Sequence, residues 1–153
     1  MITEPTTVTI STIEAEIRID ASVDAVWDAL TTGIGAWWPH RFEDDGSTVR
    51  LEPWVGGRFY ETYGNAEDGG LYAHVTYLER GRVLRTSGPM GLRGAGIYVK
   101  TYRLEADGEG TIVRTHAEML GRFDEETVAG YKVGNQAVVD ALKAFVEPSR
   151  TDR

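Results

Sequence analysis

The sequence contains no cysteine, and only three of its 153 residues are histidine. The absence of cysteine excludes disulfide bonds, thiolate metal sites and cysteine nucleophiles. His40, His74 and His116 lie far apart in the sequence and share no helical ligand spacing. Metal sites require clustered histidine and carboxylate ligands. We therefore expect neither a metal site nor a cofactor.

Long hydrophobic runs and an excess of basic residues are missing as well. No apolar stretch approaches the roughly 20 residues of a membrane-spanning helix, and residues 1–10 lack the basic start and apolar core of a secretory signal. We therefore expect a cytoplasmic protein that spans no membrane. The 16 Lys and Arg residues stand against 24 Asp and Glu, which gives a net charge of −8. Because a negative surface repels phosphate backbones, nucleic-acid binding is not expected.

Motifs of common catalytic and nucleotide-binding sites are absent from the sequence. No Gly-x-Ser-x-Gly elbow of a serine hydrolase occurs. Residues 88–96 are rich in glycine, but they fit neither the dinucleotide nor the phosphate-loop spacing and open no expected helix. We interpret this segment as a long hairpin loop, or alternatively as a mobile flap over a pocket mouth. We assign no catalytic residue.

The composition is that of a folded domain, with 41% hydrophobic and 26% charged residues. A chain of this length forms one ordinary domain. We place that single domain at residues 12–148 and expect flexible ends at residues 1–11 and 149–153. The protein is expected to be a monomer or a weak homodimer.

The first elements are a strand and two short helices. Residues 13–20 alternate apolar and charged side chains, which predicts a strand with one buried face. Ser22 is a suitable N-cap for a helix over residues 23–30, whose apolar residues follow the i, i+3, i+4, i+7 spacing. A second short helix is expected at residues 34–38, before Pro39.

The middle of the chain predicts strands separated by glycine-bearing turns. The expected strands are residues 48–51, 58–63, 71–79, 82–87, 97–105 and 111–120. Consecutive strands with short turns indicate an antiparallel meander.

The last element is a long amphipathic helix that ends before Pro148. Asp124 is its expected N-cap. Its apolar stripe contains Val128, Tyr131, Asn135, Val138, Leu142 and Phe145. The predicted fold class is α+β: a curved antiparallel sheet of about six or seven strands wrapped round this helix, with a cavity beneath it.

Four local patterns, in this order along the chain, are shared with a known superfamily. They are the Val26-Trp27 pair, Gly-Gly-Arg-Phe-Tyr-Glu at residues 56–61, Gly110-Thr111 and the helical segment 134–143. Together they resemble the START-like or SRPBCC superfamily, which has the helix-grip fold of the birch-pollen allergen. The similarity spans about residues 13–147, and it is nearest to the branch named for homologues of heat-shock ATPase activators. Asn135 departs from the pattern, since the family usually has tryptophan there.

The resemblance also orients the strands. It implies that Tyr77 faces outward, so Tyr72 and His74 are assigned to the cavity face of their strand. The same argument assigns an inward face to residues of three other strands: Phe59 and Glu61; Tyr98 and Tyr102; and Val113, Thr115 and Met119. It turns His116 outward. A shift of one residue in register would reverse any of these sets.

The inward faces define the candidate ligand-binding residues. The apolar walls are Trp38, Phe59 and Met119, and the polar, orienting residues are Tyr72, His74, Tyr102, Tyr131 and Asn135. Because adjacent residues cannot both face the core, we expect one of Trp37 and Trp38 either to line the pocket or to lie on the surface. His74 is either a satisfied inward histidine, or an orienting donor or general acid/base. Glu61 is either a carboxylate at the rim or a buried partner of an arginine.

These residues support three hypotheses about function. The first is binding of a small hydrophobic or aromatic molecule in the cavity, without assigned chemistry. The second is an enzyme that resembles the polyketide cyclases and aromatases of the superfamily and uses the same cavity. The third is an interaction module like a chaperone activator. That function requires an exposed apolar patch, and the sequence shows none.

Overall fold

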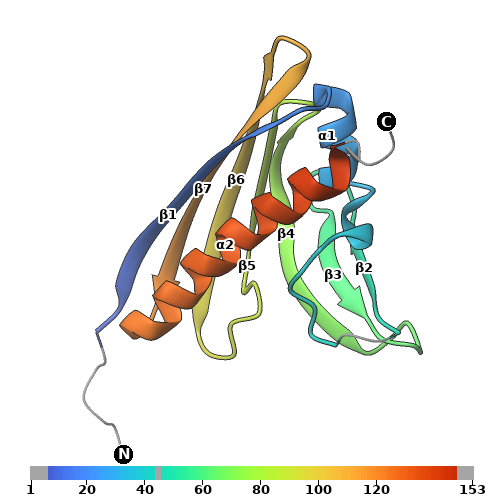
Figure 1. Cartoon of the computed structure of the whole chain (residues 1–153). Coiled ribbons are helices and arrows are strands. Elements are labelled where there is room, and N and C mark those ends of the chain that lie inside the picture. Colours follow the sequence, from blue (N-terminus) through green and yellow to red (C-terminus); the bar gives the residue numbers. More distant parts are fainter. Residues whose placement is uncertain (1–6, 44–45, 148–153) are drawn as a thin grey trace, which may run out of the picture.

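Seven strands form one antiparallel sheet that curves around a long C-terminal helix (Figure 1). The computed structural model describes residues 7–43 and 46–147. The strands are β1 (Thr9–Ile19), β2 (Thr48–Leu51), β3 (Arg58–Thr62), β4 (Gly69–Glu79), β5 (Val83–Gly88), β6 (Gly96–Asp107) and β7 (Gly110–Gly121). The helices are α1 (Val23–Leu30), the 3-10 turn η1 (Ile34–Ala36) and α2 (Glu125–Val146). The sheet order β1-β7-β6-β5-β4-β3-β2 confirms the predicted helix-grip fold.

The helix boundaries follow from local capping. The Ser22 hydroxyl accepts a hydrogen bond from the N–H of Ala25 at 3.2 Å, which starts α1. The Asp124 carboxylate accepts one from the N–H of Thr127 at 2.8 Å, which starts α2. Both N-caps are those predicted from the sequence.

The start of the first strand differs from expectation. Strand β1 begins at Thr9, which pairs with Gly121, so residues 9–11 belong to the sheet and not to a loose end. Residues 1–6 and 148–153 lie outside the described residues, and their expected flexibility stays a prediction.

The buried face of α2 also departs from the predicted stripe near its end. Phe145 is 48% exposed, whereas Val146 packs against the core. The buried positions continue from Leu142 by a step of four, not three, because 3.6 residues per turn rotate the face away from Phe145. Val139, absent from the predicted stripe, is fully buried.

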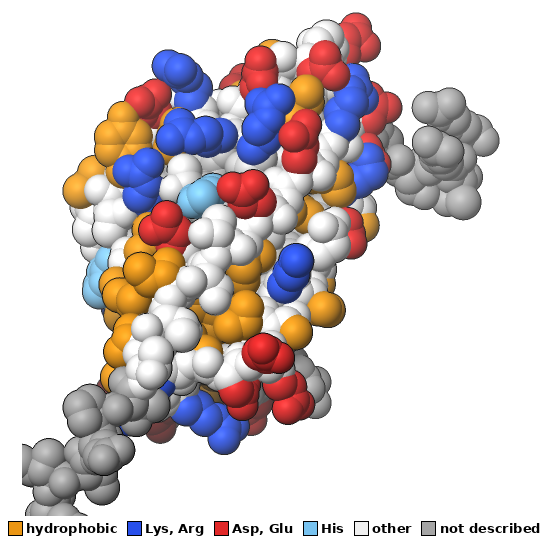
Figure 2. Space-filling view, turned by 90° about the vertical axis from the view of Figure 1, so that its left-hand side faces the viewer, with side chains coloured by type: hydrophobic (Ala, Val, Ile, Leu, Met, Phe, Trp, Pro, Cys, Tyr) orange, Lys and Arg blue, Asp and Glu red, His pale blue; other side chains and the backbone are white. Residues whose placement is uncertain are grey.

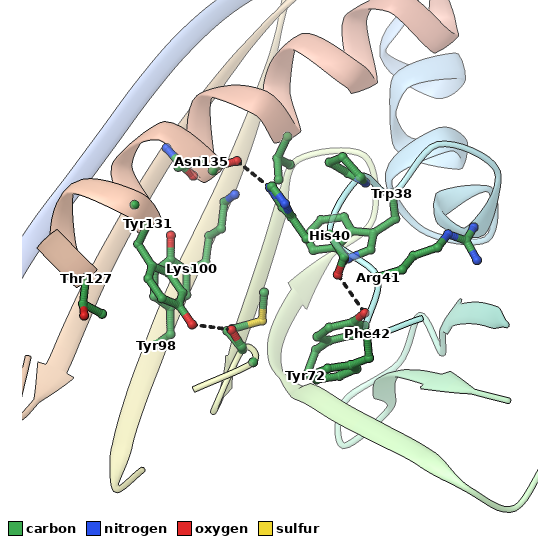
Figure 3. A pocket seen from close by; sticks show the side chains of 16 residues that line it. Trp38, His40, Arg41, Phe42, Tyr72, Tyr98, Lys100, Thr127, Tyr131 and Asn135 are labelled. Atoms are coloured by element: carbon green, nitrogen blue, oxygen red, sulfur yellow. Dashed lines mark hydrogen bonds between the residues drawn. The ribbon is translucent and has the colours of Figure 1, made fainter. Parts of the chain in front are cut away.

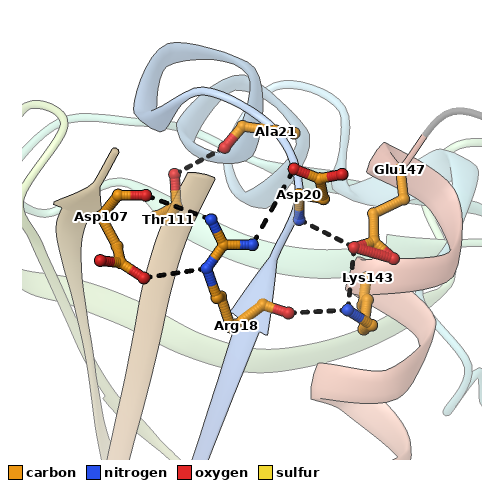
Figure 4. A network of polar contacts seen from close by, with 7 residues as sticks. All are labelled: Arg18, Asp20, Ala21, Asp107, Thr111, Lys143 and Glu147. Carbon is orange, nitrogen blue, oxygen red and sulfur yellow. Dashed lines mark hydrogen bonds and ion pairs between the residues drawn. The ribbon is translucent and has the colours of Figure 1, made fainter. Parts of the chain in front are cut away.

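A network of polar contacts joins the C-terminal end of α2 to the sheet (Figure 4). The Lys143 ammonium donates to the Arg18 carbonyl oxygen at 2.7 Å and pairs with the Glu147 carboxylate at 2.8 Å. That carboxylate accepts a hydrogen bond from the N–H of Asp20 at 2.8 Å. The Arg18 guanidinium donates to the Asp107 carboxylate at 2.9 Å. The end of the helix is thereby fixed to β1 and to the β6–β7 hairpin.

The outward face of β1 and β7 is polar in one part and apolar in another. Arg114 pairs with Glu105 at 2.6 Å, and His116 lies 2.9 Å from Glu14. Figure 2 shows charged side chains of both signs over the upper part of this view and hydrophobic ones gathered lower down.

An exposed apolar group occurs where the sequence analysis expected none. Leu120 pairs across the sheet with Ile10 on β1 and with Ile97 on β6, and all three side chains are exposed. The cross-strand pairing, which brings together residues distant in sequence, creates this group.

No helix in the described part of the chain has the length and the apolar character that a membrane span requires.

Candidate functional site

A cavity of about 580 Å³ lies between α2, strands β4 and β6, and the segment that follows η1 (Figure 3). Its lining residues are Trp38, Pro39, His40, Arg41, Phe42, Tyr72, Met90, Gly91, Tyr98, Lys100, Thr127, Gly130, Tyr131, Gly134, Asn135 and Val138. Its volume falls in the usual range of sites for small organic molecules.

One wall of the cavity is a cluster of aromatic rings. The rings of Phe42 and Tyr72 stack in parallel, with centroids 4.9 Å apart and an interplanar angle of 6°. Trp38 meets Tyr72 at 5.9 Å, and Phe59 lies behind both, 4.8 Å from each ring. Such rings supply a large apolar surface of fixed shape. We refer to Trp38, Phe42 and Tyr72 as the aromatic wall.

The buried carboxylate of Glu61 holds this wall in place. It accepts hydrogen bonds from the N–H groups of Phe42 at 2.8 Å and Glu43 at 2.9 Å, and from the Tyr72 hydroxyl. Burial raises the pKa of Glu61, but the hydrogen bonds from Tyr72, Phe42 and Glu43 outweigh it and keep that pKa below its usual value. Neither role expected from the sequence is correct, since Glu61 is not at the rim and its partners include no arginine.

The opposite wall joins α2 to the glycine-rich segment. The rings of Tyr98 and Tyr131 have centroids 5.5 Å apart. The Tyr131 hydroxyl donates to the Met90 carbonyl oxygen at 2.8 Å, and the N–H of Met90 donates to the Tyr72 carbonyl oxygen at 2.9 Å. The segment therefore contributes Met90 and Gly91 to the cavity lining. That it moves as a flap stays a prediction.

Lys100 introduces a basic group into this apolar cavity. It lies on β6, and its side chain is only 2% exposed. Its ammonium lies 4.6 Å from the centroid of the Tyr102 ring. Burial lowers the pKa of Lys100 from 10.5 to about 7. Near neutral pH the side chain is therefore present in both the charged and the neutral form.

The sequence analysis missed Lys100 although a signal was present. Tyr98 and Tyr102 are both buried, as predicted. Residue 100 lies between them at the strand period of two, so it had to share their face. Lysine is rarely buried, so its residue type argues against this face although its position favours it.

Asn135 places an unsatisfied amide oxygen at the same cavity. It is 4% exposed, and its Nδ2 donates to the Thr115 hydroxyl at a long 3.4 Å. Its Oδ1 is buried without a hydrogen-bond partner among the described residues. A buried acceptor without a partner costs about 1–3 kcal/mol.

We expect Asn135→Leu to raise the free energy of unfolding of the ligand-free protein by about 1 kcal/mol, because it removes the unsatisfied oxygen and adds apolar contact. Urea denaturation monitored by tryptophan fluorescence measures this change. Gln136→Leu, at an exposed position of the same helix, is the matched control and should shift stability by less than about 0.5 kcal/mol. A clear loss of stability in Asn135→Leu would contradict this assignment.

The structure brings together half of the predicted ligand-binding residues. Trp38, Tyr72, Tyr131 and Asn135 line the cavity. Phe59, Tyr102 and Met119 are buried as predicted, but they lie outside its lining. Trp38 lines the cavity, which is one of the two placements expected for a member of this pair, but Trp37 and Trp38 both pack in the apolar core. The Trp37 indole donates to the Ala29 carbonyl oxygen at 2.7 Å.

His74 is exposed, so its predicted inward orientation is wrong. In the pairing of β3 with β4, Phe59 faces Ala73 and Tyr60 faces Leu71, which leaves Tyr72 as an extra residue. This β-bulge buries both Tyr72 and Ala73 and reverses the alternation beyond them. His74 therefore points away from the cavity that Tyr72 lines.

His40 and Phe42 were not predicted as site residues. They belong to the irregular segment after η1, which has no periodicity from which a face can be read. The His40 ring Nε2 donates to the Gly134 carbonyl oxygen at 2.9 Å and so links this segment to α2. In the part of the chain that the structure describes, no cluster of three or more histidine or carboxylate side chains could hold a metal ion.

Comparison with known families and structures adds a match over most of the chain. Residues 11–147 match the family model described as polyketide cyclase / dehydrase and lipid transport. No curated protein matches the sequence significantly.

Several solved structures share the fold. A putative uncharacterized protein from Rhizobium leguminosarum is 18% identical, with a TM-score of 0.73 over 94% of this chain and 98% of that one. The structure of Ara h 8.0201 is 14% identical, with a TM-score of 0.66 over 90% of this chain and 98% of that one. An AHSA1-like protein from Aeromonas hydrophila is 20% identical, with a TM-score of 0.61 over 89% and 92%. At such low identities these similarities concern the fold alone.

Proposed function

The chain belongs to the polyketide cyclase / dehydrase and lipid transport family of the SRPBCC superfamily, and from this premise we propose that its cavity binds a small, largely apolar or aromatic organic molecule. The observation that carries the proposal is the cavity of about 580 Å³ lined by the aromatic wall and by Tyr98 and Tyr131. Apolar pockets with a few polar groups are typical of small-molecule sites.

Native mass spectrometry of the freshly purified protein tests this proposal. A bound molecule adds mass under native conditions, and that mass disappears on denaturation. Extraction then identifies the molecule. The same measurement on a variant with a filled cavity shows whether the extra mass depends on the cavity.

Gly130 offers such a variant. It lines the cavity from α2, and a Cβ atom at this position would meet no other atom within 4 Å. We expect Gly130→Trp to abolish the bound mass, because the indole occupies the cavity. Gly130→Ala is the control: it should retain the ligand and stabilise the helix by about 0.5–1 kcal/mol. Equal ligand occupancy in the wild-type protein and Gly130→Trp would contradict binding in this cavity.

A cyclase- or aromatase-like reaction in the same cavity is the second candidate, and Lys100 is the observation in its favour. An amine whose pKa lies near 7 suits proton transfer at neutral pH. Incubating the protein with the extracted molecule or with its unsaturated or open-chain precursors, followed by mass analysis, separates turnover from simple binding. The hypothesis of an interaction module would depend instead on Ile10, Ile97 and Leu120, on the outward face of the sheet.

A further inference from the structure

Lys100 has no counter-charge among the residues that the structure describes. Among the described residues, no carboxylate forms an ion pair with it, and its ammonium donates no hydrogen bond. Its contact with the Tyr102 ring compensates for only part of the lost hydration, since cation–π contacts contribute about 0.5–2 kcal/mol. Burying an ammonium without a partner costs several kcal/mol. The cavity therefore contains a cation that an incoming anion would stabilise.

Arg41 also lines the cavity, but its guanidinium is already engaged elsewhere. It donates to the carbonyl oxygens of Ser47 at 3.1 Å and of Gly35. Figure 3 shows the guanidinium pointing away from Lys100 and Asn135. Lys100 is thus the better placed of the two cations for a ligand inside the cavity.

Two further polar groups accompany Lys100. The Oδ1 of Asn135 is an acceptor without a donor among the described residues, and Tyr98, whose ring contacts that of Tyr131, also lines the cavity. Burial raises the pKa of Tyr98, so its hydroxyl keeps its proton and remains a donor. In Figure 3 all three side chains point into the end of the cavity between β6 and α2, away from the aromatic wall. The cavity therefore has a polar end with donors and an acceptor, and an aromatic end.

We propose that the ligand is an aromatic acid whose carboxylate or other anionic oxygen pairs with Lys100 and Tyr98, and whose hydroxyl or N–H group donates to Asn135. Its ring packs against the aromatic wall. This inference rests on the proposed function, because it specifies the chemical class of the molecule that the cavity binds.

Three related probes test the proposal by isothermal titration calorimetry at pH 6. 6-Hydroxy-2-naphthoic acid carries both the anion and the donor, 6-hydroxy-2-naphthamide lacks the anion, and 6-methoxy-2-naphthoic acid lacks the donor. We expect the wild-type protein to bind the hydroxy acid at least tenfold more tightly than the amide. We expect a smaller preference, of about threefold to tenfold, for the hydroxy acid over the methoxy acid.

Variants assign these preferences to residues. Lys100→Met should weaken binding of the hydroxy acid at least tenfold and leave binding of the amide unchanged. Lys132→Met removes the same charge at an exposed position of α2 and should change neither affinity. Asn135→Leu should abolish the preference for the hydroxy acid over the methoxy acid. Lys100→Gln provides a second uncharged variant if Lys100→Met does not fold.

The outcomes distinguish this inference from the function on which it rests. Equal binding of acid and amide, unchanged in Lys100→Met, would overturn the inference and leave the proposed function standing. Absence of binding by all three probes, together with a native mass free of ligand, would contradict both. Tighter binding of the amide than of the acid by the wild-type protein would likewise overturn the inference.

Discussion

Lys100→Met is expected to raise the free energy of unfolding of the ligand-free protein by about 2–4 kcal/mol at pH 6, because it replaces a buried, unpaired ammonium by an apolar side chain of similar length. Most substitutions of buried residues destabilise a protein. Here the wild-type lysine itself destabilises the folded protein, since it is 2% exposed and its charge lies in a largely aromatic cavity. A gain in stability combined with a loss of acid binding would show that this residue serves the ligand and not the fold.

The pH dependence of this gain follows from the pKa of Lys100. Burial lowers it from 10.5 to about 7. Between these two values the unfolded chain binds a proton that the folded chain lacks, so the contribution of Lys100 to stability rises with pH across this window. Below pH 7 Lys100 is protonated in both the folded and the unfolded chain, so the free-energy cost of burying its charge does not change with pH. The advantage of Lys100→Met should therefore be largest below pH 7 and shrink towards pH 10.

Urea denaturation of both proteins at pH 6 and pH 9 measures this difference, and Lys132→Met controls for the loss of surface charge. His40, Arg41, Tyr72, Tyr98 and Tyr131 also line the cavity and are present in both proteins, so the comparison isolates the change at residue 100. If Lys100→Met were less stable than the wild-type protein at pH 6, the contacts of Lys100 would stabilise the fold by more than the burial of its charge destabilises it.

The sequence predicts the elements well where the signals are local. The N-caps Ser22 and Asp124 and the alternation of residues 13–20 in β1 depend on neighbouring residues alone, and the structure confirms them. The exposed group formed by Ile10, Ile97 and Leu120 was not foreseen. It depends on pairing between strands, which no single segment reveals.

The site was predicted less completely because two of its determinants are not local. The bulge at Tyr72 depends on how β3 pairs with β4, and it alone turns His74 outward. The segment with His40 and Phe42 has no regular period, and contacts with Glu61 and Gly134 fix its course. Asn135 was found because a polar residue interrupts an apolar stripe, a signal that one helix contains by itself.

Glu61→Ala is expected to lower the free energy of unfolding by about 3–4 kcal/mol at pH 7. The fully buried carboxylate accepts hydrogen bonds from the N–H groups of Phe42 and Glu43 and from the Tyr72 hydroxyl. Removing the carboxylate leaves the N–H groups of Phe42 and Glu43 without their acceptor, and each costs about 1 kcal/mol or more. The Tyr72 hydroxyl also loses this acceptor and keeps the His40 carbonyl oxygen at 2.9 Å. Tyr72→Phe removes only one of these interactions and should cost about 1 kcal/mol.

The pH dependence provides a second test of the role of Glu61. Its pKa in the folded protein lies below the usual value of 4.5, so its ionised form is stabilised by folding. That contribution is fully present above the pKa of the unfolded chain and is lost as pH falls through the folded pKa. Glu61→Gln should therefore lose less stability relative to the wild-type protein at pH 3 than at pH 7, as measured by urea denaturation. An unchanged difference between these two pH values would contradict this assignment.

The same variants connect the carboxylate to the ligand. Phe42 reaches the cavity from an irregular segment, and Glu61 fixes the backbone of that segment while Tyr72 supplies the ring on which Phe42 stacks. Glu61→Ala should therefore weaken binding of both 6-hydroxy-2-naphthoic acid and its amide, because it disturbs the aromatic wall that holds the ring of either probe. Lys100→Met should affect the acid alone. If Glu61→Ala weakens binding of both probes and Lys100→Met weakens binding of the acid alone, the ring and the acid group are recognised at opposite ends of one cavity. If both variants weaken binding of both probes equally, Lys100 acts through the shape of the cavity.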